Sequence, residues 1–250
     1  MKVLIIFAVL ATLAGCGGSS SPRPGATRLA PEALATLRDL VFADQDLDEV
    51  VALQKDSPVD DPASPWPRLA TAARLQSEDE ETATAELQQV LELPGLETRI
   101  QLWTWTALRG LGVEPDATSA DVVQGVVIEM PVAGGVDTLA VFRDGTMRYF
   151  DHGGRAVFWD AREASSNAEV RELVRKPIAV AEEMPPGERG AVPDERPEYK
   201  PGSVRVAFLA FGGNRYRDVP LDAVNGSPLA PFVKAGTDII RKAGGGTGAR

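Results

Sequence analysis

The amino-acid sequence predicts an α+β fold, in which a helical N-terminal half is followed by an antiparallel β-meander with packing helices. Three patterns support this expectation. Between Pro31 and Gly112, apolar residues recur at the three- and four-residue spacing of amphipathic helices. Between Val122 and Trp159, short alternating segments are separated by glycine-containing turns, which is typical of antiparallel strands. Helical spacing returns after Ser166.

Helix signals in the N-terminal half come from prolines, caps and apolar stripes. Pro31 suits a first helical position, and Ser77 with Glu80 forms a capping-box start for a helix. The segment 96–111 is apolar nearly all round, so we expect a central and buried helix. The same half also contains a short helix near 47–51, a proline-rich loop at 58–67 and a weakly helical segment at 68–75.

The β-meander between Val122 and Trp159 is defined by its turns. Asp144-Gly145 separates two alternating runs by two residues that tolerate positive φ, which predicts a type I′ hairpin. Gly153-Gly154 predicts another turn. The continuous apolar run 126–128 predicts a strand buried on both faces. Since neither face of the meander is cleanly polar, helices should cover one side of the sheet and part of the other.

A helix and a long loop are expected after the meander. Ser166 and Glu169 form a second capping box, and Pro177 should kink the helix that follows. The proline-rich segment 185–202 is too long for an ordinary connection, so it is either functional or disordered.

Two strands and a closing helix complete the chain. The alternating segment 203–211 predicts a strand, and a glycine-rich turn leads to a return strand that ends near Val219. Ser227-Pro228 predicts the start of the last helix. Gly236 falls on the apolar face of this helix, where it should leave a gap and weaken the helix by about 1 kcal/mol relative to alanine.

The first sixteen residues, MKVLIIFAVLATLAGC, form a secretory signal rather than a membrane span. Within them, Leu13-Ala14-Gly15-Cys16 resembles the lipobox of bacterial lipoprotein precursors. In that family the cysteine thiol is acylated with diacylglycerol, the chain is cut before the cysteine, and the new amino group is usually acylated too. The resemblance implies that Cys16 is the mature first residue and the site of lipid attachment. The alternative is an ordinary cleaved signal with a chance cysteine.

The lipobox resemblance also implies a location and a way of anchoring. Two or more acyl chains hold a protein stably on a membrane, whereas one chain is marginal. The chain would therefore lie in the bacterial cell envelope. Gly17 follows the cysteine, and by similarity to enterobacterial lipoproteins this favours the outer membrane facing the periplasm in a Gram-negative cell. Residues 17–28 are small, polar and proline-containing, so they predict a tether of roughly 20 Å.

The expected organisation follows from these segments. We expect a signal peptide at 1–15, a lipidated cysteine and flexible tether at 16–28, a helical region at 29–115, an α+β region at 116–243 that forms one compact unit with the helical region, and a flexible tail at 244–250.

Acidic motifs in the helical half do not form a metal site by sequence. Asp44, Asp46 and Asp48 imitate the start of a calcium loop. However, Glu49 and Lys55 occupy the positions where such a loop needs glycine and a closing glutamate. We therefore expect no metal and no cofactor. The tryptophans of the apolar helix, Trp103 and Trp105, are interpreted as core residues and not as an aromatic box for a ligand.

His152 is the only histidine, so it cannot build a two-histidine metal site. Its neighbour Asp151 makes an Asp-His pair with a distant serine conceivable for acyl transfer. No G-x-S-x-G nucleophile elbow accompanies the pair, and adjacent residues on a strand usually point apart. A carboxylate pair for glycoside hydrolysis depends on separations that a sequence does not contain.

Three functional hypotheses remain. The first is a non-enzymatic envelope lipoprotein that binds another protein near the membrane, as an adaptor, assembly factor or inhibitor, and exposed aromatics around Trp66 or Tyr199 would support it. The second is a membrane-tethered hydrolase of cell-wall sugar or peptide that uses carboxylates or Asp151-His152. The third is a small-molecule carrier with a deep apolar cavity.

The acidic composition limits the partners. The formal charge is −10, and it becomes −11 when residues 1–15, with Lys2, are removed. Such a domain disfavours nucleic acid and direct adhesion to anionic headgroups, so the expected partners are membrane lipid through Cys16 and a protein close to the membrane. The order of the meander, the strand VRVAFLAFGG and the closing helix resembles uncharacterised bacterial proteins, which implies a fold only.

Overall fold

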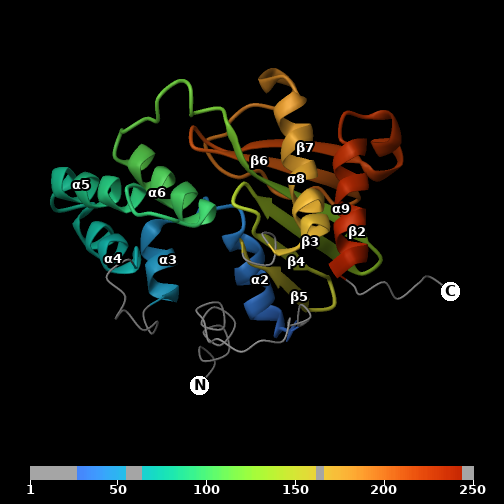
Figure 1. Ribbon diagram of the computed structural model, residues 1–250, viewed down its shortest axis with the longest axis horizontal. Helices are drawn as coiled ribbons and strands as arrows, with labels where there is room; N and C mark the ends of the chain where they lie inside the picture. Colours follow the sequence, from blue (N-terminus) through green and yellow to red (C-terminus); the bar gives the residue numbers. More distant parts are fainter. Residues whose placement is uncertain (1–26, 55–63, 162–165, 244–250) are drawn as a thin grey trace.

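The structure is a computed structural model, and it describes residues 27–54, 64–161 and 166–243. The lipobox Leu13–Cys16, most of the expected tether and the tail 244–250 lie outside the described residues. Within these ranges the chain is α+β, as the sequence predicts. Helices of the N-terminal half precede an antiparallel meander, and two long helices pack against the resulting sheet (Figure 1).

In the described part of the chain, seven strands form one antiparallel sheet in the order β1-β5-β4-β3-β2-β6-β7. The expected meander supplies β2 to β5 as successive neighbours, and β6 pairs with the free edge of β2. The strands are β1 Thr27–Arg28, β2 Val123–Val132, β3 Gly135–Phe142, β4 Met147–Phe150, β5 Arg155–Trp159, β6 Ser203–Ala210 and β7 Arg215–Pro220.

Helices cover both faces of this sheet. Figure 1 shows α8 and α9 side by side across one face, and α3 to α6 grouped at one end of the molecule. The helices are α2 Pro31–Leu40, α3 Leu47–Leu53, α4 Trp66–Leu75, α5 Glu80–Leu91, α6 Thr98–Gly110, α8 Ala168–Glu183 and α9 Ala230–Ala243, with short 3₁₀ turns η1 Pro186–Glu188 and η2 Leu221–Gly226.

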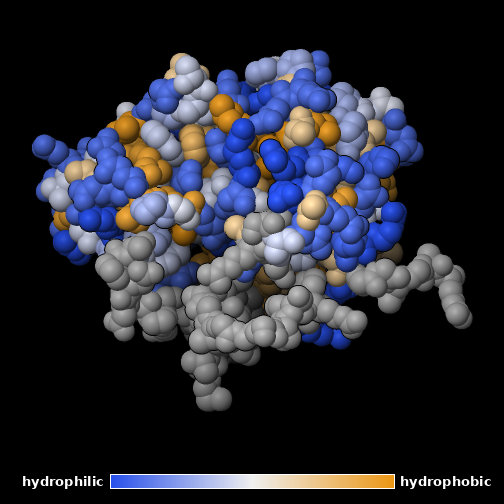
Figure 2. Space-filling view, viewed as in Figure 1, coloured by the Kyte–Doolittle hydropathy of each residue, from blue (hydrophilic) through white to orange (hydrophobic). Residues whose placement is uncertain are grey.

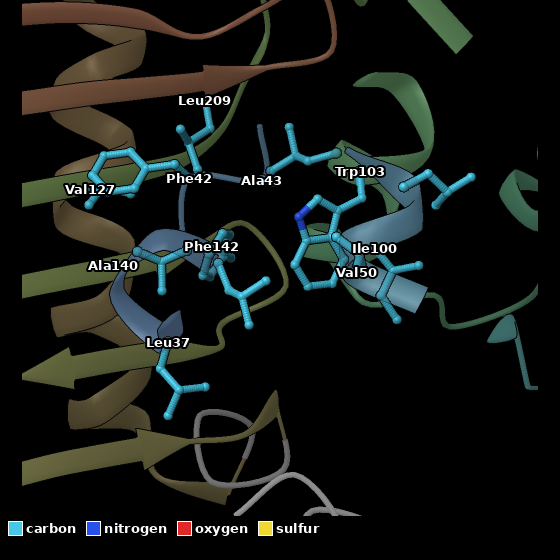
Figure 3. Close-up of a cluster of buried hydrophobic side chains, with 14 of the residues drawn as sticks. Leu37, Phe42, Ala43, Val50, Ile100, Trp103, Val127, Ala140, Phe142 and Leu209 are labelled. Carbon is cyan, nitrogen blue, oxygen red and sulfur yellow. The ribbon is translucent and has the colours of Figure 1, made fainter. Parts of the chain in front are cut away.

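Strand alternation divides the core into two clusters. Val126 and Ile128 pack with α8 and α9, whereas Val127 between them packs with α2 and with the segment that follows it. All three are fully buried, which confirms the expectation of a strand covered on both faces. Figure 3 shows the second cluster, in which Phe42 lies beside Val127 while Trp103 lies among the neighbouring helices.

The turn between β3 and β4 differs from the predicted type I′ hairpin. Gly145 has a φ of 89°, but Asp144 does not have the positive φ that a type I′ turn requires. The Gly145 N–H donates to the Phe142 carbonyl at 2.9 Å, and the Phe142 N–H donates to the Thr146 carbonyl at 3.0 Å. This is a three-residue loop closed by a bulge glycine.

The Asp144 side chain explains the change of turn type. One carboxylate oxygen accepts from the Thr146 N–H at 2.9 Å. The other accepts from the Thr98 N–H at 2.8 Å, at the start of α6. One carboxylate therefore supports a hairpin and satisfies a free N–H of a helix start, 46 residues away in the chain.

Two helices begin beside caps other than the predicted ones. Asp79, not Ser77, caps α5, and its carboxylate accepts from the N–H three residues later at 3.1 Å. Asn167, not Ser166, caps α8, and its side-chain oxygen accepts from the N–H groups two and three residues later at 3.0 and 3.2 Å. Aspartate and asparagine compete well with serine as caps, so a nearer one displaces the expected residue.

Gly236 corrects the expectation of a gap in α9. A Cβ added there would lie 3.3 Å from Ile128 Cδ1 and 3.4 Å from Leu139 Cδ2. The absence of a side chain at Gly236 therefore lets α9 approach the sheet closely. The side chains of Ile128 and Leu139 fill the space beside the glycine.

The first strand corrects the end of the expected tether. Thr27 and Arg28 pair with β5, and the Leu29 N–H donates to the Gly154 carbonyl at 2.7 Å. The prediction of a flexible segment up to residue 28 is therefore wrong for its last two residues. They cover backbone groups at the edge of β5 that would otherwise be unpaired.

Candidate functional site

The site is built around the long segment between α8 and β6. Apart from η1, residues 185–202 have no regular secondary structure, as predicted, yet arginine and tyrosine side chains hold them against the sheet. Arg189 is buried and donates to the Met184 carbonyl at 3.1 Å and the Asp121 carbonyl at 2.9 Å. At the other end, the Tyr199 hydroxyl donates to the Ser203 carbonyl at 2.6 Å.

Arg205 of β6 fastens the middle of this segment. Its guanidinium is 2% exposed and donates to both carboxylate oxygens of Asp218 on β7, at 2.8 and 3.2 Å. It also donates to the carbonyls of Pro197 at 2.8 Å and Glu198 at 2.6 Å. Burial alone would lower the pKa of Arg205, but the hydrogen bonds and charge of Asp218 raise it, so the group stays charged.

Arg196 connects the same segment to the end of α2. Its Nη2 lies 2.9 Å from Asp39 Oδ1, and its Nε lies 3.5 Å from Asp44 Oδ2. The guanidinium also lies over the Phe42 ring, 4.4 Å from its centroid, which is a cation–π contact. One side chain therefore spans from the loop to three residues of the helical half.

The turn after α2 is strained and well supported. Ala43 has a φ of 52°, in the left-handed region that alanine rarely adopts. The Asn214 side-chain amide donates to the Phe42 carbonyl at 2.7 Å, and the Thr106 hydroxyl donates to the Ala43 carbonyl at 3.0 Å. This conformation sends Phe42 into the core and leaves the next residue, Asp44, half-buried beside the loop. Strain of this kind clusters at functional sites.

These elements enclose a cleft of about 590 Å³ between α3, α6, the β6–β7 turn and the loop. We call it the acidic cleft, because two arginines and five carboxylate residues line it. The arginines are Arg109 and Arg196. Arg109 already donates hydrogen bonds to the Phe211 carbonyl and the Thr106 hydroxyl. The carboxylate residues are Asp44, Asp46, Glu49, Asp194 and Glu195.

The inner wall of the acidic cleft carries two groups with shifted pKa values. Burial raises the pKa of Asp44, and the charge of Arg196 opposes that shift. Burial and the charge of Asp44 together raise the pKa of Tyr216, whose hydroxyl lies 3.2 Å from Asp44 Oδ2. A positive charge placed in the cleft would favour the ionised form of Asp44.

The structure does not form the Asp151–His152 pair. Asp151 accepts from the Arg155 N–H at 2.8 Å, within its own turn. The His152 Nδ1 instead lies 3.0 Å from Asp137 Oδ1, and the imidazole is 43% exposed. Asp137 also accepts from the Tyr149 hydroxyl at 2.8 Å. The histidine belongs to a surface hydrogen-bond group on the turn, outside the acidic cleft.

The other residues singled out in the sequence have structural positions. Trp103 is buried and Trp105 packs against Phe211, so both are core residues as predicted. Trp66 and Tyr199 are partly buried, so neither is the exposed aromatic that the adaptor hypothesis anticipated. Cys16 lies outside the described residues.

The three residues of the calcium-like motif do not face one point. Asp44 and Asp46 line the acidic cleft, with Asp46 directly before the first residue of α3, whereas Asp48 is not part of the cleft lining. Across the part of the chain that the structure describes, no three histidine, cysteine, aspartate or glutamate side chains gather as a metal site would require. In the same residues, no helix is long and apolar enough to cross a membrane.

The charged residues that organise this site were not predicted from the sequence. Glu129 and Arg205 interrupt otherwise apolar strand runs, and a charged residue within such a run is a signal that could have been used, because buried charges need partners. Nothing local indicates that Arg196 meets Asp39, which is 157 residues away.

Comparison with known protein families, curated proteins and solved structures finds no match to this chain. The inference of function therefore rests on the residues and their geometry.

Proposed function

We propose that this chain is a lipid-anchored protein of the bacterial cell envelope, held through acylated Cys16, and that its domain binds a partner protein without catalysing a reaction. The acidic cleft carries the proposal. It would receive a basic segment of the partner, with lysine or arginine side chains against its five carboxylate residues.

The surface supports a polar mode of binding. Figure 2 shows a mostly hydrophilic face on which hydrophobic residues form small, separated spots. Binding through such a surface depends on charge complementarity more than on apolar area. The carboxylates come from α3, the turn before it and the 189–202 loop, so the fold brings together charges that are far apart in sequence.

The expected tether sets where the partner would be found. Thr27 is already part of the sheet, so about ten residues would separate the acylated cysteine from the folded domain. A flexible segment of that length spans roughly 18 Å on average. The partner, or its basic segment, would therefore lie close to the membrane surface.

We do not propose a hydrolase that uses Asp151-His152. Asp151 bonds within its own turn instead of to His152, and the histidine is directed to Asp137. No contact in the described residues gives the imidazole a serine to activate.

The test compares two variants that remove the same charge. Asp194→Asn/Glu195→Gln changes two exposed carboxylates of the acidic cleft, and Glu172→Gln/Glu183→Gln changes two exposed carboxylates of α8 on the opposite face of the sheet. A fluorescent lysine-rich peptide should bind the wild type and the α8 variant equally, and the cleft variant more weakly. A glutamate-rich peptide should not bind, and added salt should weaken the lysine-rich complex.

The same variants test the partner in cells. Affinity capture from solubilised envelopes should recover one protein with the wild type and the α8 variant, and lose it with the cleft variant. Equal capture by all three would contradict the role of the cleft. A fatty-acid probe should label the wild type but not Cys16→Ser, and equal labelling would contradict the anchor.

A further inference from the structure

A second cavity, of about 380 Å³, shares Arg196 with the acidic cleft. We call it the polar cavity. Ala35 and Arg38 of α2 line one wall, residues 197–199 of the loop line another, and Glu129 and Arg205 contribute from β2 and β6. Its volume lies within the range of about 300–1,000 Å³ that is usual for small-molecule sites.

Unsatisfied polar atoms gather beside this cavity. Within the described residues, Arg38 Nε, Glu129 Oε2 and Thr138 Oγ1 are all buried without a hydrogen-bond partner. Glu129 and Thr138 are directly paired across β2 and β3, and Glu129 and Arg38 line the same cavity. Leaving a buried polar atom unsatisfied costs about 1–3 kcal/mol, so three such atoms in one place are costly unless something binds them.

Two charged side chains that line the cavity, Glu129 and Arg38, have no opposite charge at hydrogen-bond distance. Arg205 is matched by Asp218. Glu129 Oε2 lies 3.8 Å from Arg205 Nη1, which is too long for a hydrogen bond. Arg38 donates through Nη2 to the carbonyls of Val136 at 2.6 Å and Asp151 at 2.8 Å. No carboxylate in the described ranges lies within ion-pair distance of Arg38.

A carboxylate that needs a donor and a guanidinium that needs an acceptor face the same space. We propose that the polar cavity binds the amino end of a small zwitterion or peptide, with the ligand ammonium on Glu129 and a neighbouring carboxylate or carbonyl oxygen on Arg38. Thr138, which is paired with Glu129 across β2 and β3, is fully buried and is not part of the cavity lining. This inference does not depend on the acidic cleft or on the lipid anchor.

Other ligand classes fit the same atoms less well. A phosphate or other simple anion would approach Arg38 but would meet the carboxylate of Glu129. An apolar ligand would leave all three buried atoms unsatisfied. Asp39 and Glu198 line the cavity together with Glu129, but among the described residues no three carboxylate, histidine or cysteine side chains gather closely enough to hold a metal ion, which needs several oxygen ligands.

The protonation of Glu129 agrees with this assignment. Burial raises the pKa of Glu129, and the charge of Arg205 opposes the shift without cancelling it. The charge of the carboxylate is therefore only partly compensated in the free protein, because Arg205, at 3.8 Å, gives it no hydrogen bond. An ammonium group at hydrogen-bond distance would supply that compensation, through an interaction stronger than a neutral hydrogen bond.

The test is a calorimetric titration of the full-length chain in detergent with three probes: L-alanine, trialanine and N-acetyl-trialanine. We expect saturable binding of L-alanine, trialanine or both, and at least about tenfold weaker binding of the acetylated peptide, which has lost its ammonium group. Binding of L-alanine alone assigns a free amino acid, and binding of trialanine alone assigns a peptide amino terminus. Equal binding of the acetylated peptide, or no saturable binding of any probe, would overturn the proposal.

Three variants locate the site. Glu129→Gln keeps the shape of the side chain and should weaken binding about tenfold or more. Ala35→Trp places a large ring at an exposed position on the cavity wall, so it should block binding without changing the buried polar atoms. Asp194→Asn, in the acidic cleft, should leave the affinity unchanged. Unchanged affinity in a folded Glu129→Gln or Ala35→Trp variant, checked by circular dichroism, would refute the assignment.

Discussion

Replacing Arg205 with methionine is expected to destabilise the protein by about 3 kcal/mol. The arginine side chain is 2% exposed, and its loss leaves the Asp218 carboxylate, which is 14% exposed, without its bidentate partner. It also removes the donors to the carbonyls of Pro197 and Glu198. Breaking one side of a buried ion pair costs about 3–5 kcal/mol, and the partial exposure of Asp218 places the value at the lower end.

Thermal unfolding followed by circular dichroism measures this loss. A chain of this size loses about 2–4 °C in Tm for each kcal/mol, so Arg205→Met should lower Tm by about 6–12 °C. Faster hydrogen exchange at the amides of Glu198 and Tyr199 should accompany the fall, because Arg205 holds the carbonyls of Pro197 and Glu198.

Two controls make the result specific. Arg241 is 69% exposed and pairs with Asp238 at 3.3 Å, so Arg241→Met should cost less than about 1 kcal/mol. Adding Asp218→Leu to Arg205→Met should recover part of the loss, because it removes the uncompensated carboxylate. A Tm for Arg205→Met within about 1 °C of the wild type would refute the reasoning.

Two further predictions concern the loop and the polar cavity. Gly190 has a φ of 98°, and a Cβ there would overlap the Tyr216 carbonyl oxygen, so Gly190→Ala should cost about 2 kcal/mol or more in chemical denaturation. Gly187→Ala, which meets open space, is the matched control, and equal stability of the two would contradict the clash. Because the folded-state pKa of Glu129 is raised above its usual value of 4.5, the contribution of Glu129 to stability falls as pH rises from 4.5 through that pKa. Glu129→Gln, measured without ligand, should therefore gain stability relative to the wild type over this interval, and a pH-independent difference would exclude the shift.

Most secondary structure could be predicted because its signals are local. A proline such as Pro31, at the first position of α2, favours a helix start within one turn. The alternation of apolar residues in the meander predicts strands from a few residues each. The structure has these elements where expected. The errors are also local. Asp79 and Asn167 displaced the expected serine caps, and the Asp144 carboxylate favoured a bulged loop over a type I′ turn.

The candidate site could not be predicted because its contacts are not local. The proline-rich loop was expected to be functional or disordered, and the partners that order it are Arg196 with Asp39 and Arg205 with Asp218. His152 illustrates the same limit. The neighbouring residue Asp151 accepts a hydrogen bond within its own turn. The hydrogen-bond partner of His152 is Asp137, which lies 15 residues earlier on a neighbouring strand.

The sequence by itself determined the α+β class, the order of helices and strands and the loop that forms the site, because periodicity, caps and turn residues act within a few residues. It also contains the lipobox-like segment from which the anchor is proposed. Only the tertiary structure decided which charges meet. Strand register places Glu129 beside Arg205, and the packing of α2 on the sheet brings Arg38 to the same cavity. These contacts depend on how distant segments pack, and no local pattern in the sequence encodes that geometry.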